Sequence, residues 1–243
     1  ELGRLVDICN SNIKRSSETL SYLKERGVDS YLIDKYKIGF FPQNLNKLSQ
    51  YVNFDLLKSK NIVRTNGTSD FSEYHSLIFP IFNEYGDVAG ISGRTMLDSM
   101  SIENLGIPKY KNSSYKKSNI LYGLNNSMES IIRKNHVFVV EGYFDQISMF
   151  KNGIKNSVAI CGTAFSKGHY MKLRRISDKI YFVLDNDDAG MRSSSSISNK
   201  FSKYGLNLNF LKCSKKGVKD VDEYFSKNSI SSFKKDFKII NLF

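Results

Sequence analysis

The chain has 243 residues, enough for one large domain or two small ones. Hydrophobic residues make up 40% and aromatic residues 13%, which excludes a disordered chain and allows a sizeable core. The 36 Lys and Arg residues outnumber the 24 Asp and Glu residues, and the net charge of +12 makes nucleic acid the first candidate partner. A solvated basic surface or a compositional bias is the alternative explanation of that charge.

The cysteines are few and scattered, since Cys9, Cys161 and Cys213 form no C-x-x-C pair. This pattern indicates neither a zinc knuckle nor a disulfide framework, and it favours reduced thiols in a cytosol-like compartment. The sequence has no apolar run of about 18 residues and no signal peptide, so we expect no membrane partner. Because the chain begins at Glu1 rather than Met, we expect it to be a piece of a longer protein.

The first half of the chain mixes helical and extended patterns. Residues 17–26 are typical of a helix, with a serine cap before them and Gly27 after them. Two apolar runs, residues 77–82 and 88–92, predict strands. The polar segment 83–87 between them predicts that the two strands form a hairpin with a longer loop.

From His136 onward, strand and helix patterns alternate. The predicted strands cover residues 137–140, 157–160, 179–184 and 206–211, and the predicted helices cover residues 145–152, 167–175 and 189–204. This alternation predicts an α/β fold, in which an α+β region precedes a parallel sheet with helices on both faces. The strands are short and almost entirely apolar, as strands buried on both sides are.

Acidic residues follow three of these strands. They are Glu141 after the first strand, Asp185 and Asp187 after the third, and Asp220 and Asp222 after the last. The carboxyl ends of parallel strands meet at one edge, so we expect these side chains to share a site, with Asp145 one helical turn further on. For any single acid, a helix cap or a salt bridge is the alternative role.

A cluster of carboxylates predicts a metal. Three or more of them in one place cannot all stay ionised and unpaired. Divalent cations are the usual partners, and Mg²⁺ prefers oxygen ligands. The pattern therefore indicates metal-dependent phosphate chemistry, although an Asp-x-Asp motif alone is a weak signal because many hydrolases and phosphotransferases have one.

A basic and aromatic stretch lies between Glu103 and Glu129, where no Asp or Glu occurs. Its cationic and aromatic residues include Lys109, Lys111, Lys116, Lys117, Tyr110 and Tyr115. Lysines bind phosphates, and aromatic rings stack on bases at about 1–3 kcal/mol per base. A flexible loop with solvated lysines is the alternative, but the nearby acidic motifs favour nucleic-acid binding.

Several motifs together resemble one known family. Residues 141–145 (EGYFD) and 185–190 (DNDDAG) resemble the two halves of the TOPRIM signature, which primases, type IA and II topoisomerases and some nucleases share. Residues 161–165 (CGTAF) resemble the short Gly-Thr loop of bacterial-type (DnaG-like) primases. The segments 79–81 (FPI), 93–94 (GR), 108–113 (PKYKNS) and 121–124 (LYGL) occur in the order found in the primase RNA-polymerase core. The resemblance covers residues from about 18 to 225, and the ordered set is far more specific than either TOPRIM half.

This resemblance implies a division of the chain and a set of site residues. It implies a mixed α/β basic subdomain in residues 1–135, a TOPRIM metal-binding subdomain in residues 136–212, and a C-terminal acidic and short helical segment in residues 213–243. The implied catalytic residues are Glu141, Asp185 and Asp187, which together with Asp220 and Asp222 would bind two or more Mg²⁺ or Mn²⁺ ions. The implied nucleic-acid and nucleotide-binding residues are Arg94, Lys109, Tyr110, Asn112 and Lys117.

The sequence departs from the family pattern in a few places. The usual Gly-Gly-Arg is Ser92-Gly93-Arg94 here, and the usual Asp-Gly-Asp has Asn186 in its centre, a residue that tolerates left-handed backbone. We identify neither a zinc-binding module nor a helicase-binding domain within these 243 residues. We therefore expect poor initiation by this core alone, and helicase contact through regions absent from the chain.

The implied activity is template-directed synthesis of short RNA primers on single-stranded DNA from ribonucleoside triphosphates, by a nucleotidyltransferase that acts in DNA replication in the cytoplasm. A TOPRIM nuclease and a non-catalytic nucleic-acid-binding module are the alternatives. The segments 108–113 and 121–124 favour a primase over a nuclease. His75, His136 and His169 do not cluster in the sequence, so we expect structural or exposed positions rather than ligand roles for them.

Overall fold

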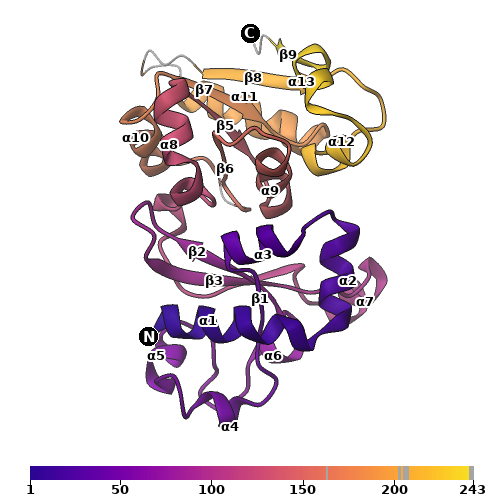
Figure 1. Ribbon diagram of the computed structural model, residues 1–243. Helices are drawn as coiled ribbons and strands as arrows, with labels where there is room; N and C mark the ends of the chain where they lie inside the picture. Colours follow the sequence, from indigo (N-terminus) through magenta and orange to yellow (C-terminus); the bar gives the residue numbers. More distant parts are fainter. Residues whose placement is uncertain (163, 202–203, 205–207, 241–243) are drawn as a thin grey trace. The chain divides into compact units, whose positions relative to one another are not determined.

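The computed structural model describes residues 1–162, 164–201, 204 and 208–240. The chain divides into two compact units, Glu1–Lys116 and Lys117–Phe243 (Figure 1). The first unit contains α1 Leu2–Asn12, η1 Ile13–Arg15, α2 Ser17–Glu25, α3 Ser30–Tyr36, β1 Gly39–Phe40, α4 Leu45–Leu48, α5 Phe54–Ser59, α6 Asp70–Glu73, β2 Leu77–Phe82, β3 Val88–Arg94, α7 Ser99–Leu105 and β4 Tyr110–Asn112. The second unit contains η2 Lys117–Asn119, α8 Leu124–Lys134, β5 His136–Val140, α9 Tyr143–Lys151, β6 Ser157–Ala159, α10 Lys167–Arg174, β7 Lys179–Val183, α11 Asp188–Phe201, β8 Leu208–Cys213, α12 Val221–Lys227, α13 Ile230–Asp236 and β9 Phe237–Ile240.

The first unit is built on an antiparallel sheet in the order β1-β2-β3-β4. The predicted hairpin is confirmed as β2 and β3. Its turn depends on Asn83, whose Oδ1 accepts hydrogen bonds from the backbone N–H groups of Tyr85 and Asp87, both at 2.9 Å. The outer strands β1 and β4 have only two and three residues, too few to give a sequence pattern.

The helix α1 contributes one side of the core of this unit. Leu5, Val6 and Cys9 form the buried stripe of α1, as the helical period requires. At Gly39 in β1, a Cβ would lie 2.5 Å from the backbone carbonyl carbon of Cys9. Glycine is therefore the residue that lets β1 run this close to α1.

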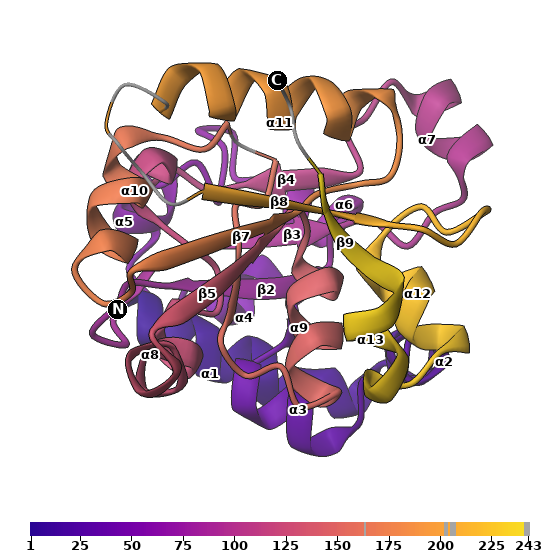
Figure 2. The same ribbon diagram turned by 90° about the horizontal axis from the view of Figure 1, so that it is seen from above.

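The second unit is the predicted α/β part. Its sheet has the order β6-β5-β7-β8-β9, in which the first four strands are mutually parallel and β9 is antiparallel. The helices α9, α12 and α13 lie on one side of the strands, and α11 lies on the other (Figure 2). Both the parallel sheet and its double covering by helices are therefore confirmed.

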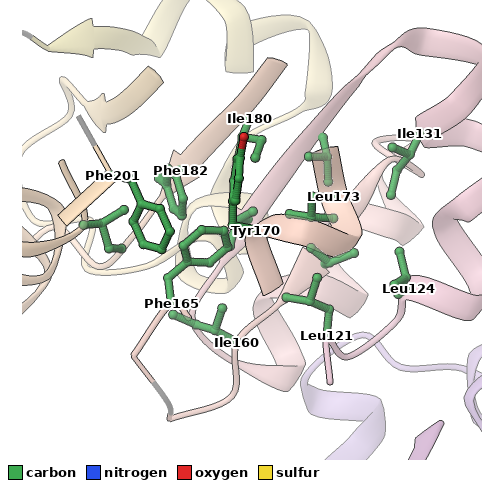
Figure 3. Close-up of a cluster of buried hydrophobic side chains, with 14 of the residues drawn as sticks. Leu121, Leu124, Ile131, Ile160, Phe165, Tyr170, Leu173, Ile180, Phe182 and Phe201 are labelled. Atoms are coloured by element: carbon green, nitrogen blue, oxygen red, sulfur yellow. The ribbon is translucent and has the colours of Figure 1, made fainter. Parts of the chain in front are cut away.

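Alternate residues of the central strands supply the core of this unit. Val137, Val139, Ile180 and Phe182 point to the same face, where they join apolar side chains of α8, α10 and α11 (Figure 3). On the opposite face, the ring of Phe138 packs edge-on against Phe233 of α13 at 6.0 Å. Burial on both faces explains why these strands have almost no polar residues.

Most of the predicted elements of this unit occur within one or two residues of their expected bounds. The predicted helix 189–204 is α11, described to residue 201, and the predicted strand 206–211 is β8, described from residue 208. Residues 202–203 and 205–207 of these predictions lie outside the described residues. None of the described helices has both the length and the apolarity needed to cross a membrane.

Candidate functional site

Two carboxylates meet at the carboxyl ends of β5 and β7. These strands pair in register with Val140 opposite Val183, so Glu141 and the loop after β7 leave the sheet side by side. The backbone N–H of Asp185 donates to Oε1 of Glu141 at 2.9 Å. The expectation that strand ends 44 residues apart deliver acids to one place is thus realised in the structure.

Asp145 joins this pair from the first turn of α9. Its Oδ2 accepts a hydrogen bond from the Gly142 N–H at 2.9 Å, and its Oδ1 accepts one from the Asp222 N–H at 3.1 Å. The side chain is buried, with 8% of the residue exposed. Asp145 therefore connects the loop after β5 to the start of α12, and it brings the segment with Asp220 and Asp222 to the same edge.

Two of the predicted site residues also cap helices. Asp220 is the N-cap of α12, and its Oδ1 accepts from the Glu223 N–H at 2.8 Å. Oδ1 of Asp187 accepts from the Gly190 N–H at 2.9 Å at the start of α11. Capping satisfies helix N–H groups and places negative charge at the positive end of the helix dipole. Helix capping, the alternative role that the sequence analysis gave for these acids, is therefore present. The same acids also lie together at one edge of the sheet.

The carboxylates repel one another strongly. Burial, together with the charges of Asp220 and Asp185, raises the pKa of Asp145 to about 7. Burial likewise raises the pKa of Asp185 to about 7, assisted by Glu141, Asp220 and Asp187 and opposed by Lys219. We call this group of carboxylates the acidic edge; its members are Glu141, Asp145, Asp185, Asp187, Asp220 and Asp222. Each ionised member disfavours the ionisation of its neighbours.

The acidic edge fits a hard divalent cation by its chemistry, because it offers oxygen donors only and its carboxylates repel one another. Within the described parts of the chain, no three His, Cys, Asp or Glu side chains are arranged closely enough to hold a metal ion. An incomplete protein ligand set is what Mg²⁺ usually has in phosphate chemistry, since it keeps several waters and adds substrate phosphates to one or two carboxylates.

The loop that carries Asp185 and Asp187 is tightly held. The Asn186 N–H donates to the Lys219 carbonyl at 2.6 Å, and its Nδ2 donates to the Val218 carbonyl at 3.2 Å. A Cβ on Gly190 would overlap the carbonyl oxygen of Asp185. The left-handed backbone considered for Asn186 is absent, and Cys161 instead has a positive φ of 47°. Asn186 thus serves by hydrogen bonding and not by its backbone freedom.

The predicted nucleic-acid-binding residues of the first unit cluster on β3 and β4. Arg94 pairs in register with Tyr110, and its Nη1 donates to the Tyr110 hydroxyl at 2.5 Å. The guanidinium lies 5.1 Å from the Tyr110 ring centroid and 5.5 Å from that of Tyr22, so it is held between two aromatic rings. Oδ1 of Asn112 accepts from the Tyr115 hydroxyl at 3.1 Å.

The lysines of the basic stretch differ in their surroundings. Lys109 is exposed on the approach to β4. The Lys111 ammonium lies 2.8 Å from Oδ2 of Asp70, so a carboxylate compensates its charge. Lys117 is half-buried and opens η2 in the second unit, the unit that carries the acidic edge.

Two family profiles match consecutive parts of the chain. The one described as DNA primase catalytic core, N-terminal domain, matches residues 8–128, and the one described as Toprim-like matches residues 138–225. The second unit is thus a Toprim-like domain, and its match includes every residue of the acidic edge.

Relatives and solved structures agree with both matches. The DNA primase of Rickettsia felis is 33% identical over 207 residues, which are 80% of this chain and 33% of the relative. The zinc-binding and RNA polymerase domains of the Aquifex aeolicus primase are 28% identical with a TM-score of 0.84, covering 96% of this chain and 58% of that one. A DnaG primase catalytic domain solved with single-stranded DNA is 25% identical with a TM-score of 0.80, covering 95% of this chain and 77% of that one.

The chain belongs to the family of bacterial-type (DnaG-like) primase catalytic cores. It spans about a third of the length of curated relatives such as that of Rickettsia felis. The order of motifs from residue 79 to residue 190 therefore identified the family correctly.

Sequence reasoning missed two features around the site. Lys219, which lowers the pKa of Asp185, has no recognisable motif. His169 is fully buried and contacts the segment that contains Lys117, as described below. Its expected structural character is confirmed, but a lone histidine gave no sign of which segment it holds.

Proposed function

We propose that this chain is the catalytic core of a DNA primase, which joins ribonucleoside triphosphates on a single-stranded DNA template into short RNA primers. The observation that carries the proposal is the acidic edge, in which the buried Asp145 and the half-buried Asp185 both have pKa values raised to about 7. Such a concentration of carboxylates at the carboxyl ends of parallel strands serves divalent cations and phosphates.

We assign the metal ligands within the acidic edge. Glu141, Asp185 and Asp187, with Asp220 and Asp222 beside them, would hold two or more Mg²⁺ or Mn²⁺ ions. When bound, these ions stabilise the charge of the attacking 3′-oxygen and of the departing pyrophosphate. The repulsion among these carboxylates favours this assignment, because bound cations would remove it.

The protein's own contribution is to position the reactants. Lys109 and Lys117 neutralise phosphates of the template or of the incoming nucleotide. Within the first unit, Tyr110 and Asn112 contribute a ring and an amide on β4, and Arg94, whose guanidinium lies over the rings of Tyr22 and Tyr110, stabilises the β3–β4 surface. The DnaG catalytic domain that was solved with single-stranded DNA supports this assignment, since it shares the fold of this chain.

Single-stranded DNA and ribonucleoside triphosphates are thus the proposed partners and substrates. A replicative helicase would be contacted through regions of the full protein that lie outside this chain. The proposed place of action is the replication fork in the cytoplasm.

The test is incorporation of a labelled ribonucleotide on single-stranded DNA with Mg²⁺ or Mn²⁺, on a bare template and on a template with an annealed primer. Extension that disappears in Asp185→Asn supports the proposal. Cleavage of the DNA in place of extension would favour a TOPRIM nuclease, and DNA binding with neither reaction would favour a non-catalytic binding module.

A further inference from the structure

The amino-terminal end of α10 holds the short segment η2, which begins with Lys117. Nε2 of His169 lies 2.9 Å from the Lys117 carbonyl oxygen, and the Ser166 hydroxyl donates to the Ser118 carbonyl at 2.5 Å. A Cβ on Gly168 would lie 2.5 Å from the Ser118 carbonyl oxygen and would overlap Oδ1 of Asn119. Three successive contacts therefore fix the backbone of η2 against α10.

The hydrogen bonds of His169 determine its tautomer. Nδ1 accepts a hydrogen bond from the Ser166 N–H at 3.2 Å, so the ring proton is on Nε2 and is donated to the Lys117 carbonyl. The ring is fully buried, and burial lowers the pKa of His169. The imidazole is therefore neutral, with one nitrogen capping α10 and the other bound to η2.

Lys117 is close to the acidic edge. The Cys161 N–H donates to the Glu141 carbonyl at 2.8 Å, so the backbone of Cys161 lies beside that of Glu141. Both Asp145 and Lys117 act on the Cys161 thiol electrostatically, the former raising and the latter lowering its pKa. The ammonium of Lys117 and the carboxylate of Asp145 are thus within electrostatic range of one sulfur atom.

We infer that His169 is a positioning residue, which fixes the backbone of Lys117 so that its ammonium binds a substrate phosphate at the acidic edge. This inference rests on the proposed function, in which Lys117 binds a phosphate. His169 itself touches no substrate in this proposal. It affects phosphate binding only because it holds the backbone of η2.

The physical reason is the shortness of η2. A 3₁₀ turn of three residues has poor hydrogen-bond geometry and little stability of its own. Lysine adds a flexible four-carbon stem, so its ammonium is precise only if its backbone is held. Without the bond from His169, we expect Lys117 to occupy many positions and to bind phosphate more weakly.

Two substitutions of His169 separate its two hydrogen bonds. In His169→Gln, the side-chain amide nitrogen stands where Nε2 is and can donate to the Lys117 carbonyl. In His169→Asn, the side-chain oxygen stands where Nδ1 is and can accept from Ser166, but the side chain does not reach Lys117. We therefore expect His169→Asn to resemble Lys117→Ala, and His169→Gln to remain close to the wild type.

Two measurements distinguish whether Lys117 binds a phosphate of the template or a phosphate of the nucleotide. If it is a template phosphate, Lys117→Ala and His169→Asn each weaken binding of labelled single-stranded DNA by about tenfold and reduce the slope of log affinity against log salt by about 0.7. If it is a nucleotide phosphate, the same two variants instead raise the KM for ribonucleoside triphosphates by about tenfold. Lys179→Ala, at the amino-terminal end of β7, is the control for loss of one exposed charge.

The decisive comparison is a double-mutant cycle. Once Lys117 is alanine, His169→Asn should have no further effect on whichever readout Lys117→Ala changed. An equal effect of His169→Asn in both backgrounds would overturn the inference, as would an effect of Lys117→Ala that His169→Asn does not reproduce. No effect of Lys117→Ala on either readout would instead remove Lys117 from the proposed function.

Gly168→Ala is a second variant, needed because His169→Asn can also weaken folding. Alanine is favoured over glycine inside a helix, so we expect the substitution to weaken phosphate binding only through the overlap of its methyl group with Ser118 and Asn119. We expect it to displace η2 and to reproduce the effect of His169→Asn with the imidazole intact. Unchanged DNA affinity, salt slope and KM in Gly168→Ala would contradict the inference.

Discussion

The burial of Asp145 predicts a specific pH dependence of stability. Its pKa is about 7 in the folded chain, against an ordinary value of 3.8, because burial and the neighbouring carboxylates disfavour its charge. A group whose pKa is raised by folding stabilises the fold fully below its unfolded pKa. That stabilisation is lost as the pH rises through the folded pKa, so the window lies between about pH 4 and pH 7.

The magnitude follows from the two pKa values. Linkage gives a loss of about 2.6 kcal/mol in the free energy of unfolding between pH 5 and pH 8 from Asp145 alone. Asp145→Asn removes this ionisation. It also leaves one of the N–H groups of Gly142 and Asp222 without its acceptor, which costs about 1–3 kcal/mol at every pH. The substitution should therefore lower stability at pH 5 and flatten its decline toward pH 8.

Urea unfolding in EDTA at several pH values measures this effect. All other titratable groups are common to both proteins, so the difference between wild type and Asp145→Asn isolates the contribution of Asp145 and its coupling to Asp185. Excess Mg²⁺ should flatten the wild-type curve as well, because a bound cation favours the ionised carboxylates. Parallel curves for the two proteins in EDTA would refute the reasoning.

Three further predictions concern other residues. Glu141→Gln keeps an acceptor for the Asp185 N–H, so we expect an unchanged circular dichroism spectrum but primer extension reduced by about a hundredfold or more; extension at the wild-type rate would remove Glu141 from the catalytic residues. Lys109→Ala should reduce the salt slope of single-stranded DNA binding by about 0.7, whereas Lys111→Ala, whose ammonium binds Asp70, should change it less; equal slopes in both variants would contradict this assignment. Gly190→Ala should lower the free energy of unfolding by about 1–3 kcal/mol, because the new methyl group overlaps the Asp185 carbonyl; an unchanged urea midpoint would show that α11 can move at no cost.

The sequence predicted the second unit well because its signals are local. Each parallel strand is a short apolar run, and residues that follow a strand lie at its carboxyl end in every parallel sheet. Glu141 and Asp185 could therefore be assigned to one place before their contact was known. The same reasoning could not give the burial of Asp145, because burial depends on α12, which lies more than seventy residues later in the chain.

The sequence did not predict the features that depend on packing between segments distant in the chain. The strands β1 and β4 are too short to have a period, and their pairing with β2 and β3 defines them. Arg94 was assigned to a binding surface, but two tyrosine rings that hold its guanidinium in the first unit could not be inferred from spacing. The role of Asn186 also differed from expectation, since hydrogen bonds to a distant loop replaced an unusual backbone angle.

The bond from the Asp222 N–H to Asp145 has a consequence for synthesis on the ribosome. It joins residues 77 positions apart, and the bond from Asp185 to Glu141 joins residues 44 apart. Contacts of such long sequence separation form slowly, and neither can form before the later partner has left the exit tunnel. The acidic edge is thus completed only when α12 emerges, so nascent chains that end before this helix keep their carboxylates dispersed, and premature termination yields fragments without a complete acidic edge.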